Sequence, residues 1–145
     1  MMGRMADLTL SLSAGTENLA EIRRFVRESA TALGAAPETA RALELAVDEA
    51  ACNAIVHGYQ GRAGLLEVEV ERDGDVVVIR LRDWAPPFDP TSLPHPDLTL
   101  PLEDRPLGGL GVYLIRQSVD EMAHRATPVG GNELTLSKRL SQGGG

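Results

Sequence analysis

Residues 65–83 carry the pattern that most restricts how this 145-residue chain can fold. Apolar residues occupy every second position in two short runs, Leu66, Val68 and Val70, then Val77, Ile79 and Leu81. Between them stands Asp73-Gly74, a dipeptide typical of tight hairpins. This alternation predicts two antiparallel strands, each with one apolar face. Asp83 has the parity of the apolar residues, so we expect its carboxylate to point inward and to need a donor partner.

Helical patterns lie on both sides of this hairpin. Thr16 can cap a first helix that runs to about Leu33, and Pro37 suits the first turn of a second helix that stops near Gly58. A third helix should follow the glycine-rich residues 108–111. Further strands are expected near residues 8–12, 122–127 and 134–136. This order predicts an α+β two-layer sandwich, with helices on one face of a mainly antiparallel sheet.

The length of the chain fits one domain with a single core. We expect a flexible leader at residues 1–6, the domain at residues 7–140 and a flexible tail at residues 141–145. Seven of the nine prolines fall within residues 85–107. A long loop of this kind is usually a functional lid or a disordered segment.

Composition argues against several classes of protein. The net charge of -7 disfavours electrostatic binding to nucleic acid, and the aromatic content of 3% leaves few side chains on which bases could stack. We therefore expect no nucleic-acid partner. The single cysteine, Cys52, excludes an internal disulfide and fits a reducing compartment. No apolar stretch is long enough to span a membrane and no signal-peptide core is present, so we expect a cytoplasmic protein.

The alanine-rich second helix carries Glu49 and Asn53, four residues apart and therefore on one face. A carboxylate beside a carboxamide suits a site where a base lies near a hard cation. The glutamate can accept a proton, and the amide oxygen can ligate Mg²⁺. The alternative is a solvated helix face, which the apolar neighbours make less attractive.

Asp83 also has two interpretations. It can simply begin a turn at the end of its strand. It can instead accept a hydrogen bond from an exocyclic amine such as N6 of adenine. The following Ala85-Pro86-Pro87 would then form a rigid wall beside a flat ring.

The run Gly108-Gly109-Leu110-Gly111 can expose main-chain N–H groups to phosphate oxygens at a helix N-terminus, or it can be a hinge. Arg105 could add a charge-assisted contact to a terminal phosphate. Thr135 is either a plain strand residue or a hydroxyl near a phosphate. His57 is expected to be structural, bonding free carbonyls in the last turn of its helix.

The order and spacing of these elements resemble the GHKL ATPases. Glu49-x-x-x-Asn53 is similar to their N box, residues 83–90 to their first glycine box, and residues 108–111 to their second. Ala85 and Pro87 stand where the family commonly has glycine. The similarity covers residues 8–140.

Within that superfamily, Asn53-Ala54-Ile55-Val56-His57-Gly58-Tyr59 and Gly131-Asn132-Glu133-Leu134-Thr135-Leu136 most resemble the small bacterial anti-sigma-factor serine kinases. The resemblance implies a mixed, mainly antiparallel sheet covered by three helices, with Mg²⁺-ATP bound beneath a mobile lid at about residues 85–107. It implies Glu49 as general base and Asn53 as Mg²⁺ ligand. The nucleotide contacts would be Asn53, Asp83, Ala85, Arg105, Gly108, Gly109, Leu110, Gly111 and Thr135.

The same resemblance implies an ATP-dependent protein serine kinase that acts as an anti-sigma factor. Such a protein binds a sigma factor and phosphorylates a serine of a STAS-type anti-sigma-factor antagonist, often as a homodimer. The main alternative is a nucleotide-responsive regulatory module with little or no kinase activity. A histidine-kinase catalytic domain fits less well, because it normally carries a dimerisation helix pair with the phosphoacceptor histidine.

Overall fold

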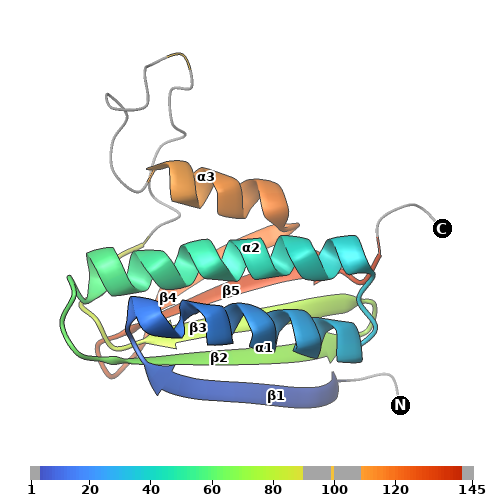
Figure 1. The fold of residues 1–145 in the computed structure, drawn as a ribbon, viewed down its shortest axis with the longest axis horizontal. Helices are drawn as coiled ribbons and strands as arrows, with labels where there is room; N and C mark the ends of the chain where they lie inside the picture. The colour runs from blue at the N-terminus through green and yellow to red at the C-terminus, as the bar shows by residue number, and fades with distance from the viewer. Residues whose placement is uncertain (1–3, 90–98, 100–108, 142–145) are drawn as a thin grey trace.

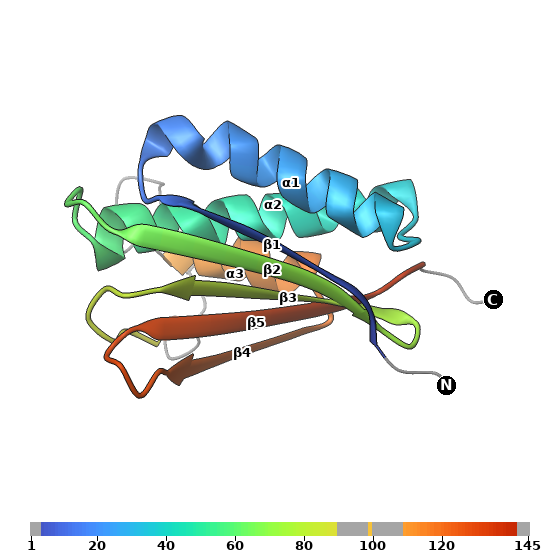
Figure 2. The ribbon, with the colours of Figure 1, turned by 90° about the horizontal axis from the view of Figure 1, so that it is seen from below.

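A computed structural model describes residues 4–89, 99 and 109–141. Five strands form one sheet in the order β1-β2-β3-β5-β4, and three α-helices cover one of its faces (Figures 1 and 2). The strands are β1 (Arg4–Ser13), β2 (Leu65–Asp73), β3 (Val76–Asp83), β4 (Glu121–Ala126) and β5 (Asn132–Arg139). The helices are η1 (Thr16–Asn18), α1 (Leu19–Ala32), α2 (Pro37–Asn53), η2 (Ala54–Gly58) and α3 (Gly109–Ser118).

The expected α+β sandwich is confirmed. All four pairings between the described strands are antiparallel, so no parallel pair of the expected mixed sheet occurs among them. Helix α2 lies between α1 and α3 on the covered face (Figure 1). Among the described residues, no helix combines the length and the apolar character needed to cross a bilayer.

The hairpin of β2 and β3 has the predicted register. The turn residues are Gly74-Asp75, and Gly74 takes a φ of 64° that favours glycine in a two-residue turn. The inward positions of both strands are buried, at Leu66, Val68, Val70, Val77, Ile79 and Leu81. Against them pack α1 and α2, so the core lies between the sheet and the helices.

The helices begin and end close to the predicted capping residues, except that the start of the first α-helix is shifted. The segment at Thr16 forms the short 3₁₀ turn η1, and α1 begins three residues later, at Leu19. Gly34, with a φ of 105°, ends α1, where the Ala35 N–H returns to the Ala30 carbonyl at 2.9 Å. Pro37 occupies the first turn of α2 as expected.

Strand β1 begins earlier in the chain than expected, within the segment predicted to be a flexible leader. It begins at Arg4, which pairs with Asp73, so residues 4–6 belong to the sheet. The register of β1 shifts between Met5 and Leu8. The start of the strand could not be predicted from the alternation of apolar and polar residues, because residues before the shift do not keep the parity of those after it.

The face of the sheet away from the helices is charged. Arg82 of β3 bonds Glu67 and Glu69 of β2 at 2.7 and 3.0 Å, and Glu133 of β5 at 2.7 Å. Opposite charges on adjacent strands support the pairing of the sheet. The two faces therefore have distinct chemistry, and only the apolar one accepts helices.

Gly131 precedes β5 and lies against the end of β3, so a substitution there probes how closely the two strands must approach. A Cβ added there would overlap the main-chain carbonyl of Asp83, whereas a Cβ on Gly130 would meet nothing within 4 Å. We expect Gly131→Ala to lower the free energy of unfolding by about 3 kcal/mol or more. Gly130→Ala, strained only by its φ of 93°, should cost about 1–2 kcal/mol. Urea unfolding followed by circular dichroism measures both, and equal losses would contradict the prediction.

Candidate active site

The last turns of α2 place Glu49 and Asn53 at the margin of the core. Their apolar neighbours Ala46, Ala50 and Ala54 are buried against the rest of the protein, while both polar side chains are half-buried. Burial raises the pKa of the Glu49 carboxyl above its ordinary value, and the negative charge of Asp48 raises it further. The structure thus holds a carboxylate with raised basicity one helical turn from a carboxamide.

Helix α3 comes closest to this pair at Gly111. A Cβ on Gly111 would lie 3.1 Å from Glu49 Oε2 and 3.5 Å from Asn53 Oδ1. Any side chain at this position would crowd Glu49, so glycine permits the close approach of α3 to α2. The glycine motif, Glu49 and Asn53 therefore meet at one place, although about 60 residues separate them in sequence.

Of the other residues in the glycine motif, Gly109 and Leu110 form the first turn of α3. Gly108 and Arg105, which were also expected to bind nucleotide, lie outside the described residues. The N-terminus of a helix carries unpaired N–H groups and a partial positive charge. The first turn of α3 therefore suits an anionic group beside Gly111.

Asp83, at the end of β3, points inward as its parity predicted and is 8% exposed. Its Oδ1 accepts hydrogen bonds from Asn132 Nδ2 at 2.9 Å and from the Ala85 N–H at 3.0 Å. Burial raises the pKa of Asp83, and the bonds from Asn132 and Ala85 and the proximity of His124 oppose that rise. Among the described residues, Oδ2 receives no hydrogen bond.

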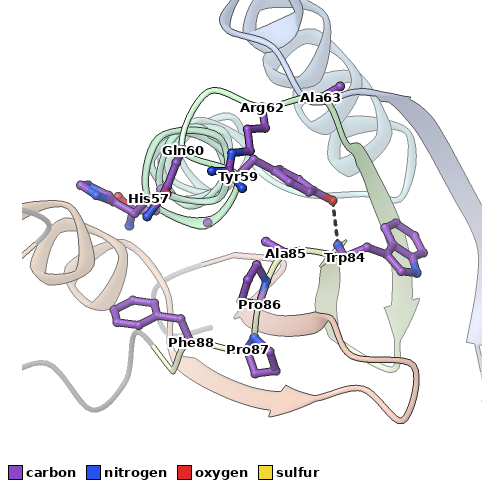
Figure 3. A pocket seen from close by; sticks show the side chains of 12 residues that line it. His57, Tyr59, Gln60, Arg62, Ala63, Trp84, Ala85, Pro86, Pro87 and Phe88 are labelled. Atoms are coloured by element: carbon purple, nitrogen blue, oxygen red, sulfur yellow. Dashed lines mark hydrogen bonds between the residues drawn. The ribbon is translucent and has the colours of Figure 1, made fainter.

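Two adjoining cavities lie beside Asn53, and one of them reaches Asp83. The larger, about 660 Å³, lies between the end of α2 with η2 and residues 84–88 (Figure 3). Its lining includes Asn53, His57 and Ala85. The smaller, about 50 Å³, reaches inward to Asp83. Asn53 lines both cavities, so the space runs continuously from the N-box residue to the buried carboxylate.

The wide π-helical turn η2 shapes the upper wall of the larger cavity. Tyr59 N–H bonds the Ala54 carbonyl at 2.8 Å, an i to i−5 spacing that makes this turn wider than a turn of α-helix. Such turns occur often at functional sites. His57 is exposed and lines the cavity, which differs from the structural role expected for an ordinary last helical turn.

Tyr59 ties this wall to the sheet. Its hydroxyl donates to the Leu65 carbonyl at 2.7 Å and accepts from the Trp84 N–H at 2.7 Å, the latter drawn in Figure 3. Tyr59 is buried, and both bonds are partly shielded from solvent. One side chain therefore fixes the distance between the loop after η2 and the segment that begins at Trp84.

Thr135 does not line either cavity. It pairs with Arg80 and lies on the charged outer face of β5, a position that favours its interpretation as a plain strand residue. Asn132 and Leu134, of opposite parity to Thr135, face inward and line the smaller cavity.

Asn132 and His124 were not recognised in the sequence. Asn132 shares the parity of the core residues Leu134 and Leu136, the same signal that identified Asp83. His124 lies on β4 directly opposite Leu134. Apolar and polar residues do not alternate clearly enough along β4 for its sequence to show which side chains face inward.

Comparison with known proteins identifies the family. Residues 12–138 match the model of the "Histidine kinase-like ATPase domain". A protein named "Serine-protein kinase RsbW" from Bacillus cereus (strain G9842) is 29% identical over 127 residues, covering 84% of this chain and 79% of that protein. Its namesake from Bacillus thuringiensis subsp. konkukian (strain 97-27) is 28% identical over 126 residues, with the same coverage.

A solved structure supports the fold. "The crystal structure of the RsbU and RsbW domains of Rv1364c from Mycobacterium tuberculosis" superposes with a TM-score of 0.67 at 22% identity. The match covers 96% of this chain, which spans only 34% of that longer chain. The resemblance to the anti-sigma-factor serine kinases of the GHKL superfamily is confirmed, and the chain belongs to the family of histidine kinase-like ATPase domains.

Proposed function

We propose that this protein is an ATP-dependent protein serine kinase that acts as an anti-sigma factor. The observation that carries the proposal is the meeting of Glu49, Asn53 and Gly111 beside a cavity that continues to Asp83. A base, a hard-cation ligand and a helix N-terminus are the parts that phosphoryl transfer requires. The relatives named serine-protein kinases support the same chemistry.

Adenine recognition is assigned to Asp83. Its Oδ1 is held by two donors, so Oδ2 is left to accept a hydrogen bond from an exocyclic amine. A 6-oxo purine would place an acceptor against this carboxylate, which is unfavourable in a buried site. The buried Ala85 lines the cavity beside it and offers an apolar surface for the ring.

Phosphate binding is assigned to the first turn of α3. Gly111 allows this helix end to approach Glu49 and Asn53 closely, because a Cβ there would lie only 3.1 Å from Glu49 Oε2. Gly109 and Leu110 would contribute main-chain N–H groups at the same helix end. Gly108 and Arg105 remain proposed phosphate contacts from the sequence.

Asn53 is proposed as the ligand of Mg²⁺. Asn53 Oδ1 lies 3.5 Å from the position of a Cβ on Gly111, and a carboxamide oxygen is a suitable ligand for a hard cation. The described residues contain no cluster of three or more His, Cys, Asp or Glu side chains that could hold a metal by themselves. Bound Mg²⁺ would offset the charge of the phosphates during transfer.

Glu49 is proposed as the general base. Its raised pKa strengthens it as an acceptor for the proton of a serine hydroxyl. Its Oε2 faces Gly111 near the end of α3 that is proposed to bind the phosphates. Few other catalytic side chains are required, since positioning and electrostatics dominate phosphoryl transfer.

The proposed partners are a sigma factor and a STAS-type antagonist that carries the phosphorylated serine, with the kinase acting in the cytoplasm as a homodimer. A regulatory module with little kinase activity needs the same cavity. Ala85 is buried and lines the larger cavity, so the methyl group at this glycine-box position occupies space that a glycine would leave open. This difference favours the second candidate, and a phosphotransfer assay separates the two.

The role of Glu49 predicts a separation of binding from catalysis. Glu49→Gln should lower the rate of serine phosphorylation about a hundredfold or more, because the proton acceptor is lost. ATP affinity should change by less than about threefold. The assay uses radiolabelled ATP and a STAS-type antagonist protein as the phosphate acceptor. Glu38→Gln, the same change in the exposed first turn of α2, is the control and should retain full activity. Normal phosphorylation by Glu49→Gln would refute the assignment.

The role of Asp83 predicts a loss of adenine selectivity. Mg²⁺-ATP should raise the melting temperature of the wild type more than Mg²⁺-GTP does. In Asp83→Asn the affinity for ATP should fall about tenfold or more, as expected for a lost hydrogen bond to a charged group. Thermal shift and calorimetric titration measure the two effects. Unchanged preference for ATP in Asp83→Asn would show that another group reads the base.

The raised pKa of Glu49 predicts a pH-dependent stability. A carboxyl whose pKa is higher in the folded state contributes stability below its unfolded pKa and loses it as pH rises through the folded pKa. Glu49→Gln should therefore be more stable than the wild type at pH 7, and the difference should vanish below pH 4.5.

Glu133 provides the control of opposite sign. Burial raises the pKa of Glu133, but hydrogen bonds from Arg125 and Arg82 and their positive charges outweigh burial and lower it. Glu133→Gln should be less stable than the wild type at pH 7, and its deficit should shrink as the pH falls. Urea unfolding at several pH values measures both variants. A Glu49→Gln variant less stable than the wild type at pH 7 would contradict the assignment.

A further inference from the structure

A chain of buried polar groups supports Asp83 from behind. Asn132, 7% exposed, donates from Nδ2 to Asp83 Oδ1 at 2.9 Å and to the carbonyls of Ala85 and Pro86 at 3.3 Å. Its Oδ1 accepts from the Phe88 N–H at 2.9 Å and lies 2.7 Å from His124 Nε2. The single amide therefore joins β3, β4, β5 and the segment after Asp83.

These partners fix the orientation of the Asn132 amide. Main-chain carbonyls only accept and a main-chain N–H only donates, so Nδ2 must face Ala85 and Oδ1 must face Phe88. His124 Nε2 must then carry a proton and donate to Oδ1. The other ring nitrogen, Nδ1, lies 3.7 Å from Asp89 Oδ1.

His124 occupies a place where an apolar side chain would be expected. The residues beside it on the inward face of this hairpin are Met122, Leu134 and Leu136. The His124 side chain is only 7% exposed, and a buried polar ring costs free energy unless it makes hydrogen bonds. Its bond to Asn132 gives it such a partner and adds a second donor to the amide oxygen.

We infer that His124 is a positioning residue for purine recognition, acting through Asn132 on Asp83. By donating to Asn132 Oδ1, it holds Nδ2 on Asp83 Oδ1 and leaves Asp83 Oδ2 directed to the ligand. This inference rests on the proposed adenine-binding role of Asp83. Selectivity for a 6-amino group would then depend on His124, Asn132 and Asp83 together, and not on Asp83 alone.

The test compares two ligands that differ only in that amino group. Calorimetric titrations with Mg²⁺ use ATP and purine riboside 5′-triphosphate, which lacks the 6-amino group. Two apolar variants of different shape, His124→Leu and His124→Met, remove the donor. His124→Gln keeps an amide N–H near the position of Nε2. Circular dichroism confirms that each variant is folded.

In both apolar variants the affinity for ATP should fall about three- to tenfold, the size expected for one lost hydrogen bond in the network. The affinity for purine riboside triphosphate should change by less than about twofold. His124→Gln should restore most of the preference for ATP. Arg125→Gln, on the same strand but bonded to Glu133 on the outer face, is the matched control and should leave both affinities unchanged.

Equal losses for both ligands, or a His124→Gln variant as weak as the apolar ones, would reduce His124 to a structural residue and overturn the inference. If the wild type prefers ATP and the apolar variants keep that preference, the inference fails while the proposed function stands. If the wild type binds both ligands equally, the adenine-binding role of Asp83 fails, and the inference fails with it.

Discussion

The burial of a small-residue face on α2 is the constraint on which the rest of the structure depends. Ala46, Ala50 and Ala51 are almost fully buried between the sheet and the neighbouring helices. Because a methyl group occupies little volume, α1 and α3 can both approach α2 closely. That approach brings Gly111 to Glu49 and Asn53, so the same packing that stabilises the core assembles the side chains proposed for catalysis.

A buried polar pair, Asp83 and Asn132, lies at one end of the sheet. Asp83 and Asn132 lie directly opposite each other on β3 and β5, and each supplies what the other requires. Burying a carboxylate is costly, and the cost is offset only where donors surround it. The Asp83 carboxylate meets that condition through one oxygen only. The other oxygen receives no hydrogen bond among the described residues, and the proposed contact with adenine would use it.

Much of this arrangement could be predicted from the sequence. Alternation placed Asp83 on the inward face, and helical spacing placed Glu49 and Asn53 together, because both periods are fixed by local backbone geometry. The same argument, applied to β5, would have selected Asn132 instead of Thr135. The turn η2 and the start of β1 could not be predicted, because a π-turn and a register shift each break the local period.

The sequence by itself determined the class of the fold, the faces of its hairpin and the motifs of the family. These follow from local periodicity and from residue types at short spacing. Only the tertiary structure decided that His124 supports Asn132, that His57 lines the cavity and that Gly111 faces Glu49. Such contacts join strands and helices distant in the chain, and they depend on how these elements pack around a shared core rather than on any local pattern.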